Sequence, residues 1–513
     1  MRKISAFLLV FVLIFSLFGC DNSKSPYVPT GNGLQQDVTT KPVTPPSAQK
    51  DLILAYFEDQ TLNPFDCVDY VNRSFMDLLY QGLFTVDATY TVKPILCKNY
   101  TVSQDMKAYT FYLEKATFSD GSSLTAADVV ESLKYAAESA FYKGRFGYLQ
   151  SISTTDDGAV QVQLTTPYEN FPLLLDIPIV KASQVRAPRP IGTGPFFFET
   201  FEGQTWLRRC PNWWCEATLP ISTDYITLQN AGSPSQMRDA FELSDLSMVI
   251  ADSGNIHYAD FHISSEELWS YESGIFLYLV CNADSEVFSN TAVRQALTSA
   301  INRTSLCNQF YRGYASPTVL PVSPTSPLYQ SGMASKVTYD PSKLTNAVTA
   351  AGLQETPVVL LVNSSDVIRV RVARSIVTAL RACGLKASTS ELQDEEYRTA
   401  LQKGEFDLHL GQTKLSANGD LSAFFAPKGT LSHGGLSDPA KYSLCTDALA
   451  NAGNYFTLYQ QILADGQLCP LLIRSYAIYS KRGVMSTLQP SRDHVFYYDL
   501  GKTMEQALLP ENN

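Results

Sequence analysis

The residue with the most specific chemical meaning is Cys20, whose thiol group follows a short apolar segment. The segment spans residues 4–18, comes after Arg2 and Lys3, and is separated from the cysteine by Gly19 alone. A basic start, an apolar run and a small residue beside a cysteine are typical of a signal peptide whose cysteine receives a diacylglycerol group. The alternative is a transmembrane anchor, but 15 apolar residues are fewer than the roughly 17–25 that a span needs. We therefore expect cleavage after Gly19 and lipid on Cys20.

The other reactive side chains form no motif for catalysis or metal binding. The histidines are scattered, and none belongs to a His-Glu-x-x-His motif. Neither Gly-x-Ser-x-Gly nor a phosphate-binding loop with its lysine occurs. The neighbouring acids Glu395 and Glu396 are expected to be exposed helix charges rather than a general acid–base pair. The sequence therefore predicts no enzyme, no cofactor and no resident metal, although His409 or His433 could contribute to a site for a chelated metal.

Nine cysteines remain after Cys20, and no Cys-x-x-Cys pair occurs among them. They are Cys67, Cys97, Cys210, Cys215, Cys281, Cys307, Cys383, Cys445 and Cys469. Cys210 and Cys215 could form a disulfide, but a buried free thiol is the expected state of most of these residues.

Length and composition predict a large soluble body. The chain has 513 residues, of which 45% are hydrophobic, enough for two or three cores. The formal net charge of −11 becomes −13 once Arg2 and Lys3 are removed, which argues against nucleic acid as a partner. Residues 21–49 are rich in Pro, Ser, Thr, Gly and Asn, so we expect a flexible tether with a reach of about 30 Å. No later apolar run is long enough to cross a bilayer, so the lipid is the expected membrane contact.

The elements that must position any site alternate between strands and helices. Strands are expected at residues 51–57, 109–113, 358–362, 386–392 and 406–410, and helices at residues 74–80, 125–140, 293–301, 367–382 and 394–403. Thr125 and Asp128 form a capping box at one helix start, and Asp156-Asp157-Gly158 predicts a hairpin turn. This alternation predicts an α/β fold in which helices cover both faces of open sheets.

Several short motifs follow one another along the chain. They are Leu62-Asn63-Pro64, Leu79-Tyr80-Gln81-Gly82-Leu83, Phe118-Ser119-Asp120-Gly121 with Ala126-Ala127-Asp128-Val129, Gly192-Thr193-Gly194-Pro195, Arg294-Gln295-Ala296-Leu297 with Asn302-Arg303, and Tyr339-Asp340-Pro341 with Ala351-Gly352. In this order they resemble the motifs of the extracellular solute-binding proteins of family five, the oligopeptide, dipeptide and nickel receptors of ABC importers. The resemblance covers roughly residues 50–505.

The resemblance implies a two-lobed fold like that of the periplasmic binding proteins, of the type II, large three-domain variety, with a hinge between the lobes. The implied division is a signal peptide at 1–19, a lipidated tether at 20–49, a discontinuous first lobe at 50–62, 181–275 and 473–513, a subsidiary α/β domain at 63–180, and a second lobe at 276–472. A solute held between the lobes would favour the closed state by its differential affinity.

In peptide receptors of this family, an acidic residue of the second lobe pairs with the free amine of the peptide. The matching positions here, Leu415, Ser416 and Ala417, hold no acid. Asp420 matches a second acid of the family, which forms a turn. The resemblance therefore leaves three alternatives: Asp420 takes over the amine, Glu58 does so, or the solute carries no amine at that end.

The resemblance also implies further contacts with the solute. The expected ligand-binding residues are Glu58, Asp59, Thr193, Gly194, Tyr278, Asn363 and Asp420. Each has a structural alternative: a solvated loop acid for Glu58 and Asp59, a turn glycine for Gly194, a core residue for Tyr278 and a turn former for Asn363.

We therefore expect a lipid-anchored, monomeric receptor that captures a peptide or peptide-like solute and delivers it to the permease subunits of an ABC importer. The alternatives are a receptor for a sugar or a chelated metal, an exported enzyme on a similar scaffold, and a sensor that no longer serves a permease.

Overall fold

The computed structural model describes residues 52–482 except 220, 222 and 256–266, and in addition residues 484, 488, 490–492, 494 and 495. Cys20, the segment 1–19 and the tether 20–49 lie outside the described residues, and their roles stay predictions.

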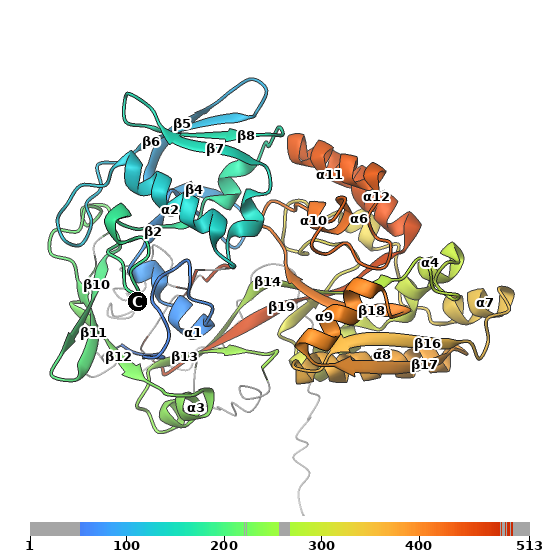
Figure 1. Ribbon diagram of the computed structural model, residues 1–513. Helices are drawn as coiled ribbons and strands as arrows, with labels where there is room; N and C mark the ends of the chain where they lie inside the picture. Colours follow the sequence, from blue (N-terminus) through green and yellow to red (C-terminus); the bar gives the residue numbers. More distant parts are fainter. Residues whose placement is uncertain are drawn as a thin grey trace, which may run out of the picture.

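A mixed sheet of 11 strands runs through the molecule (Figure 1). Its order is β10-β11-β12-β1-β13-β19-β14-β18-β16-β17, and β15 pairs with β19. We call the half with β1 and β10–β13 the first lobe, and the half with β16–β18 the second lobe. The first-lobe strands are β1 Ile53–Tyr56, β10 Phe196–Phe201, β11 Gln204–Arg209, β12 Tyr225–Asn230 and β13 Met248–Asp252. The others are β14 Glu267–Cys281, β15 Ala315–Pro317, β16 Pro357–Asn363, β17 Lys386–Leu392, β18 Leu408–Lys414 and β19 Leu468–Ser480.

Two long antiparallel strands, β14 and β19, join the lobes. β19 pairs with β13 at one end, and β14 pairs with β18 at the other. The register between β14 and β19 shifts between Glu272 and Phe276, and Gly274 in this irregular stretch has a φ of +72°. Glycine adopts positive φ without steric cost, and a bulge bends the strand that contains it. The junction of the two lobes therefore lies at this irregular stretch.

The second lobe is built on a parallel layer. β16 pairs in parallel with β17 and β18, and the connecting helices are α8 Val367–Ala382 and α9 Asp394–Lys403. Leu360 shares one core with residues of α8, whereas Leu361 shares another with Ala400 of α9. Strand β16 is apolar on both faces because a helix covers each side. The prediction of helices on both faces is confirmed here, and the strand expected at 406–410 begins two residues later.

A smaller antiparallel sheet, with the order β5-β6-β8-β7, lies at the top of Figure 1. Its strands are β5 Cys97–Val102, β6 Ala108–Leu113, β7 Leu149–Thr154 and β8 Val160–Leu164. Helix α2 Ala126–Glu138 packs on it through Val129 and Leu133, and Asp128 accepts the backbone N–H of Thr125 at 2.9 Å. We call this sheet with α2 the subsidiary unit. The predicted capping box and hairpin are thus confirmed, while the exact domain limits stay predictions.

The remaining strands form two short pairs, and the remaining α-helices have four to 12 residues. Two strand pairs, β2 Gln81–Gly82 with β9 Pro178–Ile179 and β3 Phe84–Val86 with β4 Val92–Pro94, flank the subsidiary unit. The other helices are α1 Tyr70–Arg73, α3 Pro234–Glu242, α4 Thr291–Ala300, α5 Arg303–Tyr311, α6 Ser331–Ala334, α7 Ser342–Ala350, α10 Ser422–Phe425, α11 Pro439–Ala450 and α12 Tyr455–Asp465.

The prediction of a helix at residues 74–80 is wrong. The chain forms α1 earlier, because the Asp69 side chain caps the backbone N–H groups of Val71 and Asn72. The α-helical hydrogen-bond pattern ends after Arg73, and only a single 3-10 turn, Met76–Leu78, follows. The carbonyl of Leu79 accepts a hydrogen bond from the backbone N–H of Gly194, so the end of this segment is tied to a distant part of the chain.

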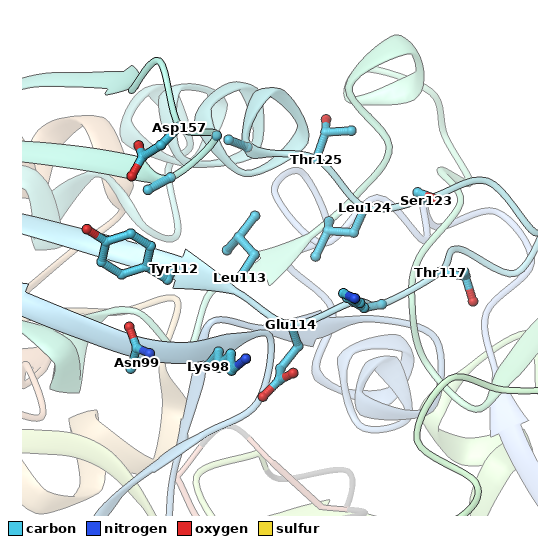
Figure 2. A pocket seen from close by; sticks show the side chains of 15 residues that line it. Lys98, Asn99, Tyr112, Leu113, Glu114, Thr117, Ser123, Leu124, Thr125 and Asp157 are labelled. Carbon is cyan, nitrogen blue, oxygen red and sulfur yellow. The ribbon is translucent and has the colours of Figure 1, made fainter.

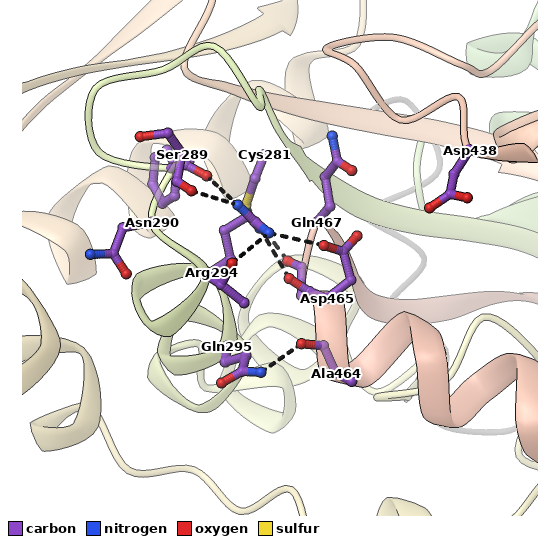
Figure 3. A network of polar contacts seen from close by, with 12 residues as sticks. Cys281, Ser289, Asn290, Arg294, Gln295, Asp438, Ala464, Asp465 and Gln467 are labelled. Atoms are coloured by element: carbon purple, nitrogen blue, oxygen red, sulfur yellow. Dashed lines mark hydrogen bonds and ion pairs between the residues drawn. The ribbon is translucent and has the colours of Figure 1, made fainter. Parts of the chain in front are cut away.

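Arg294 ties the helices of the second lobe together (Figure 3). Its Nη2 donates to Oδ1 of Asp465 at 2.9 Å, and its Nη1 donates to the carbonyl groups of Phe288 and Ser289. Lys441 of α11 reaches the other oxygen of Asp465 at 2.9 Å. The buried guanidinium is thus fully bonded, and it connects α4 with α12 and, through Asp465, with α11.

The nine cysteines after Cys20 are free thiols, and all but Cys215 are buried. This confirms the state expected for most of them. Within the part of the chain that the structure describes, no helix has the length and apolar character that a membrane span requires.

Candidate functional site

The two lobes meet at Arg474 of β19, next to the irregular stretch of β14. Its Nη2 forms an ion pair with Asp252, the last residue of β13 in the first lobe, and its Nη1 donates to Oε1 of Gln412 in the second lobe at 3.0 Å. Burial acts to lower the pKa of Arg474, but the charge of Asp252 outweighs it and the pKa is raised. The buried Nε has no hydrogen-bond partner among the described residues. A buried charge pair therefore lies where the two lobes join.

Glu58 and Asp59 lie in the exposed loop that follows β1. Oε2 of Glu58 accepts a hydrogen bond from Nδ2 of Asn230, at the end of β12, at 3.0 Å. In the segment that follows this loop, the ring of Tyr70 stacks on Tyr476 of β19 with centroids 5.7 Å apart. Helix α1, which follows this loop, thus packs against the crossing strand β19.

Thr193 and Gly194 are packed between the first lobe and the segment that contains Leu78 and Leu79. The carbonyl of Thr193 accepts a hydrogen bond from Nε1 of Trp213 at 2.9 Å, and its buried hydroxyl has no partner in the described structure. A Cβ atom at Gly194 would lie 2.5 Å from the carbonyl oxygen of Leu78. Glycine is therefore required here by the close approach of two backbone segments.

Tyr278 and Asn363 both fit their structural alternatives. The ring of Tyr278 is buried against Phe276 and Phe424, with centroids 5.2 and 5.1 Å away. Nδ2 of Asn363 donates to Asp394 at 2.7 Å, and its Oδ1 accepts the backbone N–H of Ser365 at 2.8 Å. Asn363 thus shapes the turn between β16 and α8; whether either residue contacts a solute stays a prediction.

Asp420 lies where the subsidiary unit meets the second lobe. Its Oδ1 accepts the backbone N–H of Ser422 at 2.8 Å, and burial raises the pKa of its carboxyl group. Across the interface the hydroxyl groups of Tyr148 and Ser422 are 2.6 Å apart, and Asn418 donates to the hydroxyl of Tyr168. The acid is therefore a turn former in a tyrosine-rich contact between the two parts.

His409 is a further polar residue of the second lobe, and it lies next to Tyr278. The ring of His409 lies edge-on to Tyr278 and to His433, with centroids 6.2 Å away in each case, and its Nε2 is 2.5 Å from the hydroxyl of Tyr397. Burial, helped by His433 and the charge of Arg369, lowers the pKa of His409 to about 3. His409 is therefore neutral at physiological pH.

The structure does not gather the seven predicted site residues into one cluster. Sequence reasoning missed Asp252, Arg474 and Gln412, which are brought together from three strands. Asp252 and Arg474 are 222 residues apart, so no local spacing could have identified them. A basic residue inside the apolar strand 468–480 was the available signal.

A hollow of about 820 Å³ lies elsewhere, on the subsidiary unit (Figure 2). Figure 2 shows that its walls come from β5, β6, the segment before α2 and the turn with Asp157. It contains none of the predicted site residues and lies away from the junction of the lobes. Among the described residues, no group of three His, Cys, Asp or Glu side chains is arranged to hold a metal ion.

Two sheet halves joined by crossing strands, with buried charges at the junction, define the class of two-lobed binding proteins. The sequence model for bacterial extracellular solute-binding proteins, family 5, matches residues 91–434. The chain belongs to this family.

Similar curated proteins include the glutathione-binding protein GsiB of Salmonella choleraesuis (strain SC-B67), 27% identical over 332 residues, and that of Escherichia coli O157:H7, 28% identical over 325 residues. Each match covers 60% of this chain and 62% of the relative, so the chain spans less than two thirds of those proteins.

Solved structures with the same fold have lower identity. CtaP of Listeria monocytogenes matches with a TM-score of 0.73 at 17% identity, over 88% of this chain and 99% of that one. NikA of Brucella suis in complex with Fe(III)-EDTA matches with a TM-score of 0.71 at 19% identity, over 87% and 99%. AppA of Bacillus subtilis in complex with a nonapeptide matches with a TM-score of 0.63 at 20% identity, over 88% and 98%.

Proposed function

We propose that the protein is the extracytoplasmic solute-binding component of an ABC importer and delivers a peptide or peptide-like solute to the permease subunits. The observation that carries the proposal is the family match over residues 91–434 on a fold whose lobes are joined by two crossing strands. The relatives named for glutathione and the structure with a nonapeptide support a peptide solute. We further propose that it acts as a monomer, without enzymatic activity, and is held at the membrane by lipid on Cys20.

The proposed mechanism is closure of the lobes around the solute. A solute that touches both lobes stabilises the closed state by its differential affinity for that state. Enclosure removes water, so protein donors and acceptors must meet the polar groups of the solute. Asp252, Arg474 and Gln412 join both lobes at one point, and the tyrosine-rich contact near Asp420 joins the subsidiary unit to the second lobe.

A chelated metal is the second candidate solute. The structural neighbours include NikA with Fe(III)-EDTA and NikZ of Campylobacter jejuni with Ni(L-His). The lack of an acid at Leu415, Ser416 and Ala417 favours this alternative, because a chelate needs no amine partner.

Thermal denaturation with a solute panel tests the proposal. The panel contains glutathione, trialanine, mixed tri- to pentapeptides, neutral sugars, Fe(III)-EDTA and Ni(L-His). A peptide at 100 times its Kd should stabilise the protein by about 2.7 kcal/mol. Solution scattering with that peptide should show a smaller radius of gyration, as closure requires. Stabilisation by sugars or chelates alone would replace the peptide by that solute, and no response to any class would contradict the proposed function.

The lipid anchor has its own test. Cys20→Ser should release the protein from membranes to the soluble fraction with an unchanged melting temperature, since the thiol is the proposed acylation site. Continued membrane association of this variant would contradict the anchor.

A further inference from the structure

Glu169, in the segment that follows β8, is an exposed residue that forms two hydrogen bonds with the second lobe. Its backbone N–H donates to the carbonyl of Leu449 at 2.8 Å, and its Oε2 accepts the backbone N–H of Ala452 at 3.0 Å. Leu449 lies in the last turn of α11, and Ala452 begins the 3-10 turn Ala452–Asn454 that leads to α12. The last carbonyl groups of a helix and the first N–H groups of the next have no partners within those helices. Glu169 therefore supplies an acceptor and a donor to two helix ends in another part of the molecule.

The segment around Glu169 is fixed to the subsidiary unit. The backbone N–H of Tyr168 donates to the carbonyl of Met106 at 3.1 Å, and the hydroxyl of Tyr109 in β6 donates to the carbonyl of Tyr168. The rings of Tyr168 and Phe171 also pack together, with centroids 5.9 Å apart. Glu169 is therefore held in place by the sheet rather than by the second lobe alone.

The subsidiary unit packs on the first lobe, so the bonds of Glu169 span the two lobes. Val129 and Leu133 of α2 share one hydrophobic core with Leu54 of β1 and Leu228 of β12. Figure 1 shows α11 beside the subsidiary unit at the top of the view, with the crossing strands β14 and β19 below. Bending at the irregular stretch of β14 would therefore separate α11 from Glu169.

The interface next to Glu169 is closed to solvent. Asn418 of the second lobe is 2% exposed and donates to the hydroxyl of Tyr168. Ala417 shares a small apolar cluster with Tyr90 and Leu173. Glu169 borders this interface and does not fill it, so its replacement leaves no cavity.

We propose that Glu169 is a latch that stabilises the closed state of the lobes and determines how readily they open. A hydrogen bond with an ionised acceptor contributes more than a neutral one, and on opening the carboxylate and both helix ends are hydrated instead. The latch goes beyond the proposed function because it acts with or without a solute, whereas its effect on solute release rests on that function. Loss of the carboxylate should raise the open fraction about tenfold, the equivalent of about 1.4 kcal/mol.

Two variants remove the side-chain bond from opposite sides of the interface. Glu169→Ala removes the acceptor, and Ala452→Pro removes the donor. Proline fits at this position because Asn451 before it is extended, with a φ of −151° and a ψ of 112°, and because the first residue of a helical turn donates no bond within it. Glu131→Ala is the matched control, since it removes an exposed carboxylate of α2 that pairs with Lys134 of the same helix.

Hydrogen–deuterium exchange of the full chain without added solute measures the opening, through the segment 417–419 that is buried at the interface. Glu169→Ala, Ala452→Pro and the double variant should each exchange this segment about tenfold faster than the unchanged protein, because the same bond is lost in all three. Glu131→Ala should exchange it at the unchanged rate. Thermal denaturation confirms that each variant is folded.

Faster exchange confined to residues 449–454, with the segment 417–419 unchanged, would make Glu169 a local helix cap and overturn the latch. Additive effects of the two substitutions in the double variant would overturn it as well, since they would then act independently. Neither result bears on the proposed function.

Solute release separates the two proposals. A peptide that stabilises the unchanged protein in the solute panel should be released about tenfold faster by Glu169→Ala than by Glu131→Ala, and equal rates would contradict the latch while leaving peptide binding in place. An unchanged protein that responds to no solute would contradict the proposed function, whereas the exchange result would still support the latch.

Discussion

Replacing Asp252 by asparagine removes the negative partner of Arg474 at the junction of the lobes. The two side chains are 18% and 5% exposed, so solvent cannot replace the lost charge. Breaking a buried pair by removing one partner costs about 3–5 kcal/mol. Gln412 still accepts from Arg474 at 3.0 Å, and the asparagine oxygen can accept as well, so we expect the lower end, about 3 kcal/mol.

Urea unfolding followed by circular dichroism measures this loss. Asp239→Asn is the matched control, because Asp239 forms an exposed pair with Arg238 and should change stability by less than about 1 kcal/mol. The double variant Asp252→Leu with Arg474→Met should recover part of the loss, since it removes both charges. The reasoning is refuted if Asp252→Asn costs no more than Asp239→Asn, or if the double variant is no more stable than Asp252→Asn.

Three further predictions follow from named contacts. Burial alone would lower the pKa of His494, but Asp77 at 2.6 Å and a second carboxylate raise it from 6.5 to about 10. The protonated form of His494 therefore contributes its full stability to the folded state below pH 6.5. This contribution should be lost as the pH rises to about 10. His494→Gln should flatten that part of the stability–pH curve, and an unchanged curve would contradict the pair. Gly194→Ala should lower the free energy of unfolding by about 2 kcal/mol because its Cβ has no room, whereas Gly147→Ala, in open space, should have little effect; equal effects would refute the close approach. Asp420→Ala should weaken peptide binding at least tenfold, about 1.4 kcal/mol by calorimetry, if Asp420 holds the amine, and unchanged affinity removes it from the site.

Much of the second lobe could be predicted from local pattern. Helix α8 has the predicted bounds, 367–382, and so has α9, 394–403. Their apolar residues recur at helical spacing, and flanking strands are apolar on both faces, so local preference and burial agree. The capping box at Thr125 and the hairpin at Gly158 are equally local. The helix expected at 74–80 failed because the chain begins its helix earlier, at the Asp69 cap, and continues beyond Arg73 only as a single 3-10 turn.

The candidate site was predictable only in part. The position of Tyr278 in a core follows from its apolar strand, and Asn363 forms a turn by local bonds. The pair of Asp252 and Arg474 depends on the order of strands β13, β19 and β14 in the sheet. That strand order is a property of the whole fold, so no regular spacing of residues along the chain indicates it.

The sequence by itself determined most helices and strands of the second lobe, the family of the chain and the absence of an acid at 415–417, because periodicity and residue type act over a few neighbouring positions. Only the tertiary structure decided which charges find partners. It joins Arg474 to Asp252 across 222 residues, since burial and hydrogen-bond geometry arise only when distant segments pack against one another.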